Sequence, residues 1–480
     1  MSSLNIRKPS EKVLWNKVKL QLELKKHIGS DHVIIDTEGC NIYSRDAYTS
    51  YRQTPLAVVL PENDPQVIDT LQFCRTYEIP IIPRGAGTSL SGCASAYEDA
   101  VVLCLSRMNK IVEIDYENRT VTAQTGITNF AISETIAEQG FFYAPNPASQ
   151  MSCTLGGNIG TNAGGINALK YGTTSAHILG MKFITIEGDV IQLGGNFGDS
   201  IGYDLGAFLI GSEGQLGIVT EATVRIIPKA ENARPMLIGF ETEKDASKCI
   251  AAIMRSRITP SAMEFMDKTA IQISRPTVDY GPSDKEQLKN TDALLLVEVE
   301  GSETEITAQL NVLEGIAFEH FHTFTKISNT DEDAKDLWQI RRNLYPALCK
   351  QAQTYIIDGT IPANTLPDVL PKVRHICANY NLQVIHIFHA GDGTLKPIIL
   401  YNSHDAEDSA NVTKAVSEIL RLCLRVGGYL SGEHGIGLEK RDLMQDQFGP
   451  HEIGQQTRIK HAFDSRELLN PGKVFPVNMV

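Results

Sequence analysis

Apolar runs alternate with amphipathic segments along most of the chain. From Pro55 onward, the apolar run LAVVL at 56–60, the amphipathic run at 66–78 and the run IPIIP at 79–83 predict one βαβ unit. Further upstream, residues 10–28 carry apolar side chains at helical spacing among lysines and glutamates. This pattern predicts an amphipathic helix that packs on the protein rather than one that anchors it in a membrane.

Three short apolar runs at 101–105, 111–115 and 120–126 follow closely, and we expect them to pair with one another in an antiparallel or mixed sheet. Glycine density falls after residue 228, which predicts a domain boundary near 228–235. Beyond it, the runs at 236–240, 245–256 and 293–300 have the β–α–β rhythm of a smaller α+β domain. Residues 279–292 are polar and charged and predict a surface loop. The turn-rich segments after 430 indicate that the chain returns to its first domain.

Glycine clusters are the strongest chemical signal in the chain. The segment IPIIPRGAGTSLSG at 79–92 runs from a strand into a tight turn, where bare backbone amides can approach a diphosphate and Arg84 can add positive charge. It is not a Rossmann fingerprint, because Leu90 occupies the position of the third glycine, and it lacks the lysine of a P-loop. Further clusters at 146–172 and 210–219 suit a large polar ligand.

Composition narrows the range of partners and compartments. With 44 basic and 57 acidic residues the net charge is −13, so the surface repels nucleic acid and anionic lipid. The nine cysteines form no C-x-x-C pair, which argues against a zinc ribbon or an iron–sulfur run and favours reduced thiols. No stretch reaches the ~18 apolar residues of a membrane span, and the start of the chain has no signal-peptide core. We therefore expect a cytoplasmic protein with at most peripheral membrane association.

Six motifs together carry a family resemblance. They are PRGAGTSLSG (83–92), CTLGGNIGTNAGG (153–165), ALKYG (168–172), GYDLGAFLIGSEGQLGIV (202–219), SGEHGIGLEKR (431–441) and LNPGKVFP (469–476). In this order the chain resembles, from about residue 40 to 478, the FAD-linked oxidases of the vanillyl-alcohol-oxidase/PCMH type. Within them it is most similar to the FAD-linked subunit of glycolate oxidase and to the D-lactate and D-2-hydroxyglutarate dehydrogenases.

The resemblance implies an α+β protein with a PCMH-type FAD-binding domain of two α/β subdomains and a ferredoxin-like substrate or cap domain. The expected organisation is an N-terminal helical segment (1–50), the FAD-binding domain (51–230), the cap domain (231–430) and a C-terminal segment (431–480) that packs back on the FAD domain. Noncovalent FAD is implied, since no histidine occurs in 83–92. The residues implied to bind it are Pro83, Arg84, Gly85, Ala86, Gly87, Thr88, Ser89, Ser149, Thr154, Gly156, Gly157, Asn158, Thr161, Asn162, Gly164, Gly165, Glu213, Gly214, Gly217, Ile218 and Asn470.

Two residues are candidates for the reacting centre. Arg341, one helical turn after Trp338, matches the family's arginine for the substrate carboxylate, and a guanidinium can clamp a carboxylate with two hydrogen bonds. His434 matches the family's general base, and an imidazole titrates near ~6.5, close to the optimum for accepting a proton at neutral pH.

The chain departs from its relatives where they carry H-x-G-D-G-N-x-H, whose histidines hold a divalent metal together with the glutamate of G-E-H-G. Here His389 and Glu433 are kept, but Lys396 replaces the second histidine, and an ammonium cannot ligate a metal. In the predicted strand 384–389, His386 and His389 face opposite sides, so His386 is no expected substitute.

Three hypotheses stay open for this centre. The Lys396 ammonium takes the place of the metal, pairs with Glu433 and stabilises the developing alkoxide; or the site has decayed; or a weakened metal site persists through His389, Glu433 and water. A bound metal therefore stays uncertain.

The implied function is FAD-dependent oxidation of a small D-2-hydroxy acid, glycolate or D-lactate, to the 2-oxo acid. Because the chain shows neither a nicotinamide fingerprint nor iron–sulfur cysteines, we expect electrons to pass to a partner protein or quinone. For a glycolate oxidase the resemblance implies companion flavin and iron–sulfur subunits at the inner membrane face. The alternatives are a D-2-hydroxyglutarate or D-lactate dehydrogenase that acts alone and a flavin-binding subunit with weakened catalysis.

Overall fold

The computed structural model describes residues 6–197, 201–274 and 288–477, and these form two compact units. The first unit contains the described residues of 6–165, 172–229 and 433–477. The second unit contains 166–171 together with the described residues of 230–432. Most of the predicted loop at 279–292 lies outside the described residues, which resume at Leu288. No helix in the described ranges combines the length and apolar character that a membrane crossing requires.

The first sheet of the first unit is built around the predicted βαβ unit. Its strand order is β1-β2-β4-β3, with β2 and β3 parallel to β4 and β1 antiparallel to β2. The strands are β1 (Val33–Ile34), β2 (Ala57–Val59), β3 (Ile81–Arg84) and β4 (Val101–Cys104). Helix α4 (Asp64–Tyr77) connects β2 to β3; it starts at the Asn63 cap, whose side chain accepts from the Gln66 amide, and ends at Glu78 in the left-handed conformation.

The pairing predicted for 101–105 is wrong. Strand β4 does not join the two strands that follow it but lies between β2 and β3 in the first sheet. All of β4 is buried, as is typical of a central parallel strand covered on both faces, whereas the next two strands are partly exposed. The continuous apolar run VVLC is thus the signature of a parallel strand that the sequence interpretation did not use.

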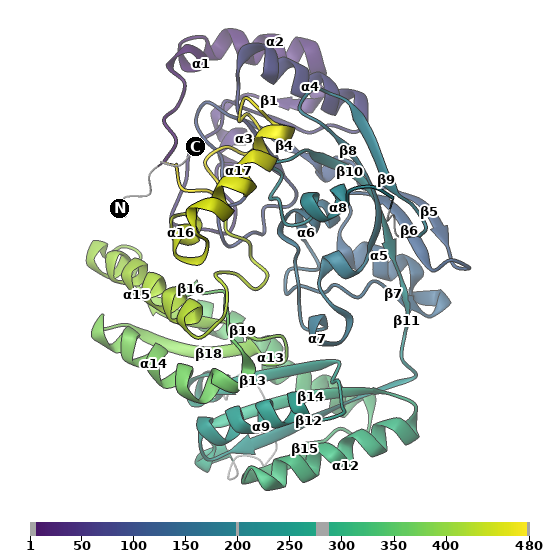
Figure 1. Cartoon of the computed structure of the whole chain (residues 1–480), viewed down its shortest axis with the longest axis vertical. Helices are drawn as coiled ribbons and strands as arrows, with labels where there is room; N and C mark the ends of the chain where they lie inside the picture. Colours follow the sequence, from purple (N-terminus) through teal and green to yellow (C-terminus); the bar gives the residue numbers. More distant parts are fainter. Residues whose placement is uncertain (1–5, 198–200, 275–287, 478–480) are drawn as a thin grey trace. The chain divides into compact units, whose positions relative to one another are not determined.

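The second sheet of the first unit is antiparallel, with strand order β5-β6-β10-β8-β9. Its strands are β5 (Ile111–Asp115), β6 (Thr120–Gln124), β8 (Ile178–Ile184), β9 (Val190–Gly194) and β10 (Ile218–Arg225). A small pair is formed by β7 (Phe141–Phe142) and β11 (Ile227–Pro228). The helices of this unit besides α4 are α1 (Glu11–Trp15), α2 (Lys17–Ile28), α3 (Thr37–Ile42), α5 (Asn129–Ile136), α6 (Leu155–Thr161), α8 (Leu205–Leu209), α16 (Met444–Gln447) and α17 (Pro450–Phe463). The helix predicted over 10–28 therefore forms, interrupted at Asn16 (Figure 1).

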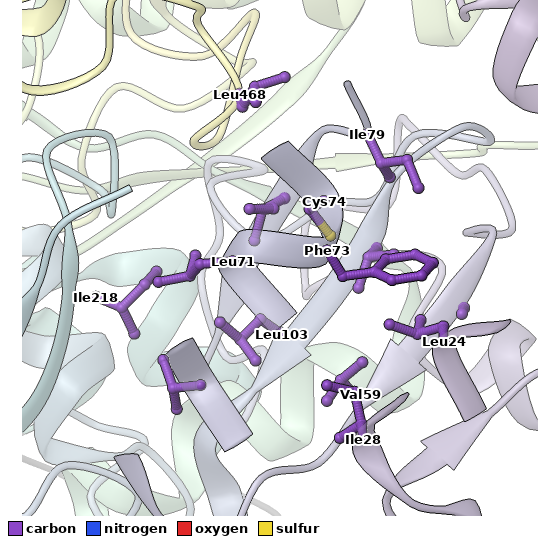
Figure 2. Close-up of a cluster of buried hydrophobic side chains, with 14 of the residues drawn as sticks. Leu24, Ile28, Val59, Leu71, Phe73, Cys74, Ile79, Leu103, Ile218 and Leu468 are labelled. Carbon is purple, nitrogen blue, oxygen red and sulfur yellow. The ribbon is translucent and has the colours of Figure 1, made fainter. Parts of the chain in front are cut away.

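One apolar core holds the first sheet, α2 and α4 together, and the end of the chain contributes to it (Figure 2). Leu71 and Cys74 of α4 are fully buried there, and Leu24 of α2 is almost so. Leu468 and Leu469 join the same core, and the Ile81 amide of β3 donates to the Leu468 carbonyl at 2.8 Å. The segment that contains Leu468 and Leu469 is thus part of the first unit.

The second unit is a seven-stranded antiparallel sheet with order β15-β12-β14-β13-β18-β20-β16. Its strands are β12 (Asn232–Phe240), β13 (Ala262–Asp267), β14 (Ala293–Gly301), β15 (His322–Ile327), β16 (Gln353–Ile356), β18 (Gln383–His389) and β20 (Pro397–Tyr401), with a separate pair β17 (Gly359–Thr360) and β19 (Thr394–Leu395). Its helices are α7 (Ala168–Tyr171), α9 (Glu243–Arg255), α10 (Lys268–Ser274), α12 (Glu303–Glu319), α13 (Asp331–Gln351), α14 (Leu366–Asn379) and α15 (Ala406–Arg425).

The first four strands of this sheet have the predicted ferredoxin-like arrangement. The chain runs β12–α9–β13–α10–β14–α12–β15, and apart from the inserted α10 the spatial order β15-β12-β14-β13 is that of a βαββαβ unit. Alternate residues of the strands face opposite layers. Leu296 and Ile387 pack with Trp338 of α13, whereas Phe265 and Phe388 lie on the other face and stack with ring centroids 4.9 Å apart.

A short segment of the glycine-rich region folds with the second unit. Ile166 packs against its core, and α7 follows directly. Lys170 Nζ lies 2.7 Å from Glu300 Oε1 of β14, and the Tyr171 hydroxyl donates to the same carboxylate. The segment 166–171 is therefore held by packing and by charge to a strand more than a hundred residues away.

Candidate functional site

The first glycine loop presents bare amides directly after β3. No protein acceptor is assigned to the backbone N–H groups of Gly85–Ser89 in the described part of the chain. A Cβ at Gly85 would overlap the Thr154 hydroxyl, and one at Gly87, whose φ is +75°, would overlap the Arg84 guanidinium. Successive unpaired N–H groups in a loop that excludes a Cβ at Gly85 and Gly87 fit a diphosphate, which needs aligned donors at close approach.

Arg84 belongs to the structure of this loop. Its Nη1 donates to the carbonyls of Arg45 at 2.9 Å and Ala94 at 3.3 Å, and its guanidinium lies 5.6 Å from the centre of the Tyr43 ring. Burial lowers the pKa of Arg84, although its charge is kept at neutral pH. Arg84 therefore brings a positive charge to the base of the loop while it holds the loop to neighbouring segments.

The second glycine cluster is shaped by hydrogen bonds inside the first unit. Thr154 caps α6, with its hydroxyl accepting from the Gly157 amide at 3.2 Å. The Asn162 side-chain oxygen accepts from the Ser175 amide at 2.9 Å, and the Asn158 amide contacts Cys153 Sγ. The other cofactor candidates of this cluster are Ser149, Gly156, Thr161, Gly164 and Gly165; among them Gly164 and Gly165 are buried.

The third glycine segment and the end of the chain are joined by Glu213 and Asn470. The buried Glu213 carboxylate accepts from the amides of Ile436 at 2.6 Å and Gly437 at 2.9 Å. Asn470 Nδ2 donates to the carbonyls of Glu213 at 2.7 Å and Cys93 at 2.9 Å. Burial raises the pKa of Glu213, opposed by these amides. The side chains of Glu213 and Asn470 thus have partners inside the protein.

Near Glu213, the predicted cofactor contacts of Gly214, Gly217 and Ile218 would have to come from their backbone atoms. Gly214 has φ +72°, Gly217 would meet Phe183 if it carried a Cβ, and Ile218 begins β10 in the apolar core. Cofactor contacts of these residues stay a prediction.

The loop that carries Glu433 and His434 is fixed by the same network. The Ser91 hydroxyl donates to the His434 carbonyl at 2.8 Å, two residues before the amides held by Glu213. Glu433 Oε1 lies 3.9 Å from His434 Nε2, and both side chains are largely buried, with 11% exposure. A backbone anchored on both sides holds the His434 imidazole in a restricted region.

In the second unit, Arg341 and His389 meet at a residue that the sequence interpretation missed. Glu264 of β13 is fully buried; its Oε2 accepts from Arg341 Nε at 2.6 Å, and its Oε1 is hydrogen-bonded to His389 Nδ1. Burial acts to raise the pKa of Glu264, but the positive charge of His389 and Arg341 outweighs it and holds the pKa at about 2. A single acid within the apolar strand AMEFMD was the available signal.

Lys396 lies close to this cluster in the chain, between β19 and β20, and only 8% of it is exposed. Burial raises the pKa of the Asp392 carboxyl, while the charges of His389 and Lys396 act in the opposite direction. Asp358, a second buried acid, accepts from the Ser431 hydroxyl at 2.7 Å and the Gly432 amide at 3.0 Å. Asp358 therefore holds the last residues of the second unit, which accounts for an acid at this position.

A divalent metal has fewer ligands here than in the family's motif. Over the described ranges, no three side chains of His, Cys, Asp or Glu gather closely enough to hold one. His389 is kept, but the position of the family's second histidine carries a lysine, whose ammonium cannot ligate a metal. The residues of the second unit alone do not make up a metal centre, and no step below is derived through a metal.

Two family models match the chain, although their ranges do not coincide with the two units. Residues 55–194 match the FAD binding domain family, and residues 229–474 match the C-terminal domain of FAD linked oxidases. Among curated proteins, the glycolate oxidase subunit GlcD of Escherichia coli (strain K12) is 36% identical over 95% of this chain and 90% of its own length. The D-lactate dehydrogenase of Anaerostipes hadrus is 30% identical over 96% of this chain and 98% of its own.

Solved structures show the same fold at low identity. p-Cresol methylhydroxylase with substrate bound has a TM-score of 0.80 at 17% identity, covering 98% of each chain. Alkyldihydroxyacetonephosphate synthase has a TM-score of 0.74 at 18% identity, covering 97% of this chain and 86% of its own. The PCMH-type fold, the bare amides of the first glycine loop and the relatives agree on an FAD-linked enzyme. The chain belongs to the family of FAD-linked oxidases.

Proposed function

We propose that the protein oxidises a small D-2-hydroxy acid, glycolate or D-lactate, to the corresponding 2-oxo acid. The observation that carries this proposal is the largely buried Arg341, whose Nε is held by Glu264. A guanidinium fixed through Nε keeps its two terminal nitrogens for a bidentate contact, and a carboxylate is the anion that this geometry recognises. The names of the relatives, among them a D-2-hydroxyglutarate dehydrogenase of Xanthomonas citri pv. viticola that is 30% identical, point to the same substrate class.

We assign residues of the chain to three tasks in this oxidation: substrate binding, proton removal and charge stabilisation. Arg341 binds the substrate carboxylate, and His434 accepts the proton of the 2-hydroxyl group. The Lys396 ammonium stabilises negative charge on the substrate oxygen as that proton leaves. The glycine segments of the first unit would hold FAD, which would supply the hydride acceptor for oxidation of the substrate carbon.

Reduced flavin has to pass its electrons on, and we propose a partner protein or a quinone as acceptor. The glycolate oxidase relatives carry the word subunit in their names, which supports a companion chain. We further propose a cytoplasmic protein with companion flavin and iron–sulfur subunits that bring it to the inner membrane face, a proposal supported by the resemblance to this subunit.

Anaerobic flavin reduction tests the proposal. Glycolate, D-lactate, L-lactate and D-2-hydroxyglutarate are added separately to the purified holoprotein, and bleaching of the flavin band is followed. We expect glycolate or D-lactate to bleach it. Bleaching by D-2-hydroxyglutarate alone would instead support the dehydrogenase that acts on the longer acid, and no bleaching by any acid would support a flavin-binding subunit without this activity.

A pair of neighbouring arginines sharpens the test. Arg341→Lys removes the bidentate fork, and we expect KM to rise by about tenfold to a hundredfold, the range for loss of one charged hydrogen bond. Arg342→Lys changes the exposed neighbour and serves as the matched control. Equal effects of the two substitutions would contradict the role of Arg341.

A further inference from the structure

Three elements of the second unit converge on one carboxylate. Strand β13 pairs with β18 so that Glu264 lies opposite His389, and α13 brings Arg341 to the same face of the sheet. Glu264 is fully buried, whereas the side chains of Arg341 and His389 are 18% and 8% exposed. The acid therefore lies beneath its two partners, which separate it from solvent.

The two carboxylate oxygens are divided between the two partners. Oε2 accepts from Arg341 Nε, and Oε1 is bonded to His389 Nδ1. Each oxygen of the Glu264 carboxylate therefore has a partner of its own, one of them the guanidinium of Arg341. A buried charge is tolerated when it is paired and fully hydrogen-bonded, and Glu264 meets both conditions.

We infer that Glu264 is a positioning residue that holds Arg341 and His389 in the orientations that substrate binding requires. This inference rests on the proposed function, because it assigns the anion held by Arg341 to the substrate class proposed above. For Arg341, bonding through Nε fixes the plane of the guanidinium and directs the terminal nitrogens away from Glu264. For His389, the hydrogen bond between Nδ1 and the Glu264 carboxylate fixes the plane of the imidazole ring.

Removal of the charge should therefore disturb both partners together. In Glu264→Gln the side chain keeps its shape but has one acceptor oxygen, so it satisfies either Arg341 or His389. We expect KM to rise about tenfold or more, as for the loss of a charged hydrogen bond, and the acid limb of the kcat/KM profile to move. Glu264→Asp keeps the charge and should recover part of the loss.

A matched control lies on the same face of the sheet. Glu298 of β14 is also a largely buried acid, and it accepts from Trp338 Nε1 at 2.7 Å and from the Ser261 hydroxyl at 2.9 Å. Its partners have no assigned part in the reaction. Glu298→Gln therefore measures how the loss of a buried carboxylate affects the stability of the second unit. The KM for the hydroxy-acid substrate is expected to change less than twofold in this variant.

A double-substitution cycle separates positioning from general damage. If Glu264 acts through Arg341, Glu264→Gln should raise KM much less in an Arg341→Lys background than in the unaltered protein. Additive effects of the two substitutions would overturn the inference, as would equal KM changes in Glu264→Gln and Glu298→Gln. Melting temperature and bound flavin are measured for every variant to establish that it is folded.

Binding of an unreactive dicarboxylate keeps the test independent of turnover. Oxalate is titrated against each holoprotein, and the shift in melting temperature and the flavin spectrum are recorded. We expect oxalate to bind at least tenfold more weakly to Glu264→Gln than to Glu298→Gln. If no hydroxy acid bleaches the flavin, the proposed reaction fails while weaker oxalate binding in Glu264→Gln still supports the positioning role. Unchanged oxalate binding in Glu264→Gln, or no oxalate binding to the unaltered protein, overturns it.

Discussion

Gly165, in the second glycine cluster, is a residue where an added methyl group should be poorly tolerated. Its φ is +135°, a region that side-chain-bearing residues rarely adopt. A Cβ there would lie 2.5 Å from the carbonyl carbon and oxygen of Asn146 and 2.7 Å from the Pro147 nitrogen. These are backbone atoms next to Pro145, whose carbonyl accepts from the buried Asn129 side chain at 2.8 Å, so the loop cannot withdraw freely.

Two costs add in Gly165→Ala. Left-handed or extended positive-φ backbone costs an alanine about 1–3 kcal/mol, and an overpacked methyl group costs about 1–3 kcal/mol more. We therefore expect the free energy of unfolding of the first unit to fall by about 2–6 kcal/mol, and bound flavin to fall with it. Urea unfolding followed by far-ultraviolet circular dichroism measures the first quantity, and the absorbance ratio at the flavin and protein bands measures the second.

Gly454→Ala is the control, since Gly454 lies inside α17 with open space around its Cα and a negative-φ helical backbone. Alanine is favoured over glycine within a helix, so this variant should be as stable as the unaltered protein or slightly more so. If Gly165→Ala loses less than about 1 kcal/mol and keeps its flavin, the reasoning from φ and close contact is refuted.

Three further results are expected. Lys396→His restores a second histidine, so metal analysis should find a divalent ion in this variant but none at stoichiometric level in the unaltered protein. Stoichiometric zinc in the unaltered protein would contradict the role given to Lys396. Burial lowers the pKa of His386 to about 4, so the unfolded chain binds a proton at a higher pH than the folded protein, and stability should fall as the pH drops from about 6.5 to 4. Urea unfolding at pH 5 and 7.5 should show that His386→Leu loses this pH dependence of stability. An unchanged pH dependence in this variant would argue against the role given to His386. Leu71→Ala in the core of the first unit should lower the free energy of unfolding by about 2–5 kcal/mol in the same assay, with a loss below 1 kcal/mol counting against close packing there.

Local patterns were sufficient for many elements of the fold. The helix at α4 and the strands β2 and β3 follow from periodicity, an Asn cap and short apolar runs, which act within a few residues. The partner of β4 could not be predicted in the same way, because strand pairing depends on segments that are distant in sequence. Its fully apolar run was the one local sign of a parallel position.

The residues of the candidate site likewise include some that local sequence patterns identify and others that only the fold brings together. Arg341 and His434 were identified because they match residues of the resembled family, and His434 lies in one of its motifs. Glu264 stands in no motif, and its importance depends on the register that sets β13 against β18. The internal partners of Glu213 and Asn470 were also beyond reach, since they join residues more than two hundred positions apart.

The segment 166–171 has a consequence for protein engineering. A fragment cut at residue 229, where the match to the C-terminal oxidase domain begins, would leave out Ile166, whose side chain packs in the core of the second unit, and Leu169, which lies against Gly391. It would also remove Lys170 and Tyr171, which are partners of the Glu300 carboxylate. A chimaera that takes the second unit of a relative should therefore also take that relative's residues at positions 166–171. Otherwise part of the apolar core of the transplanted unit would be left uncovered.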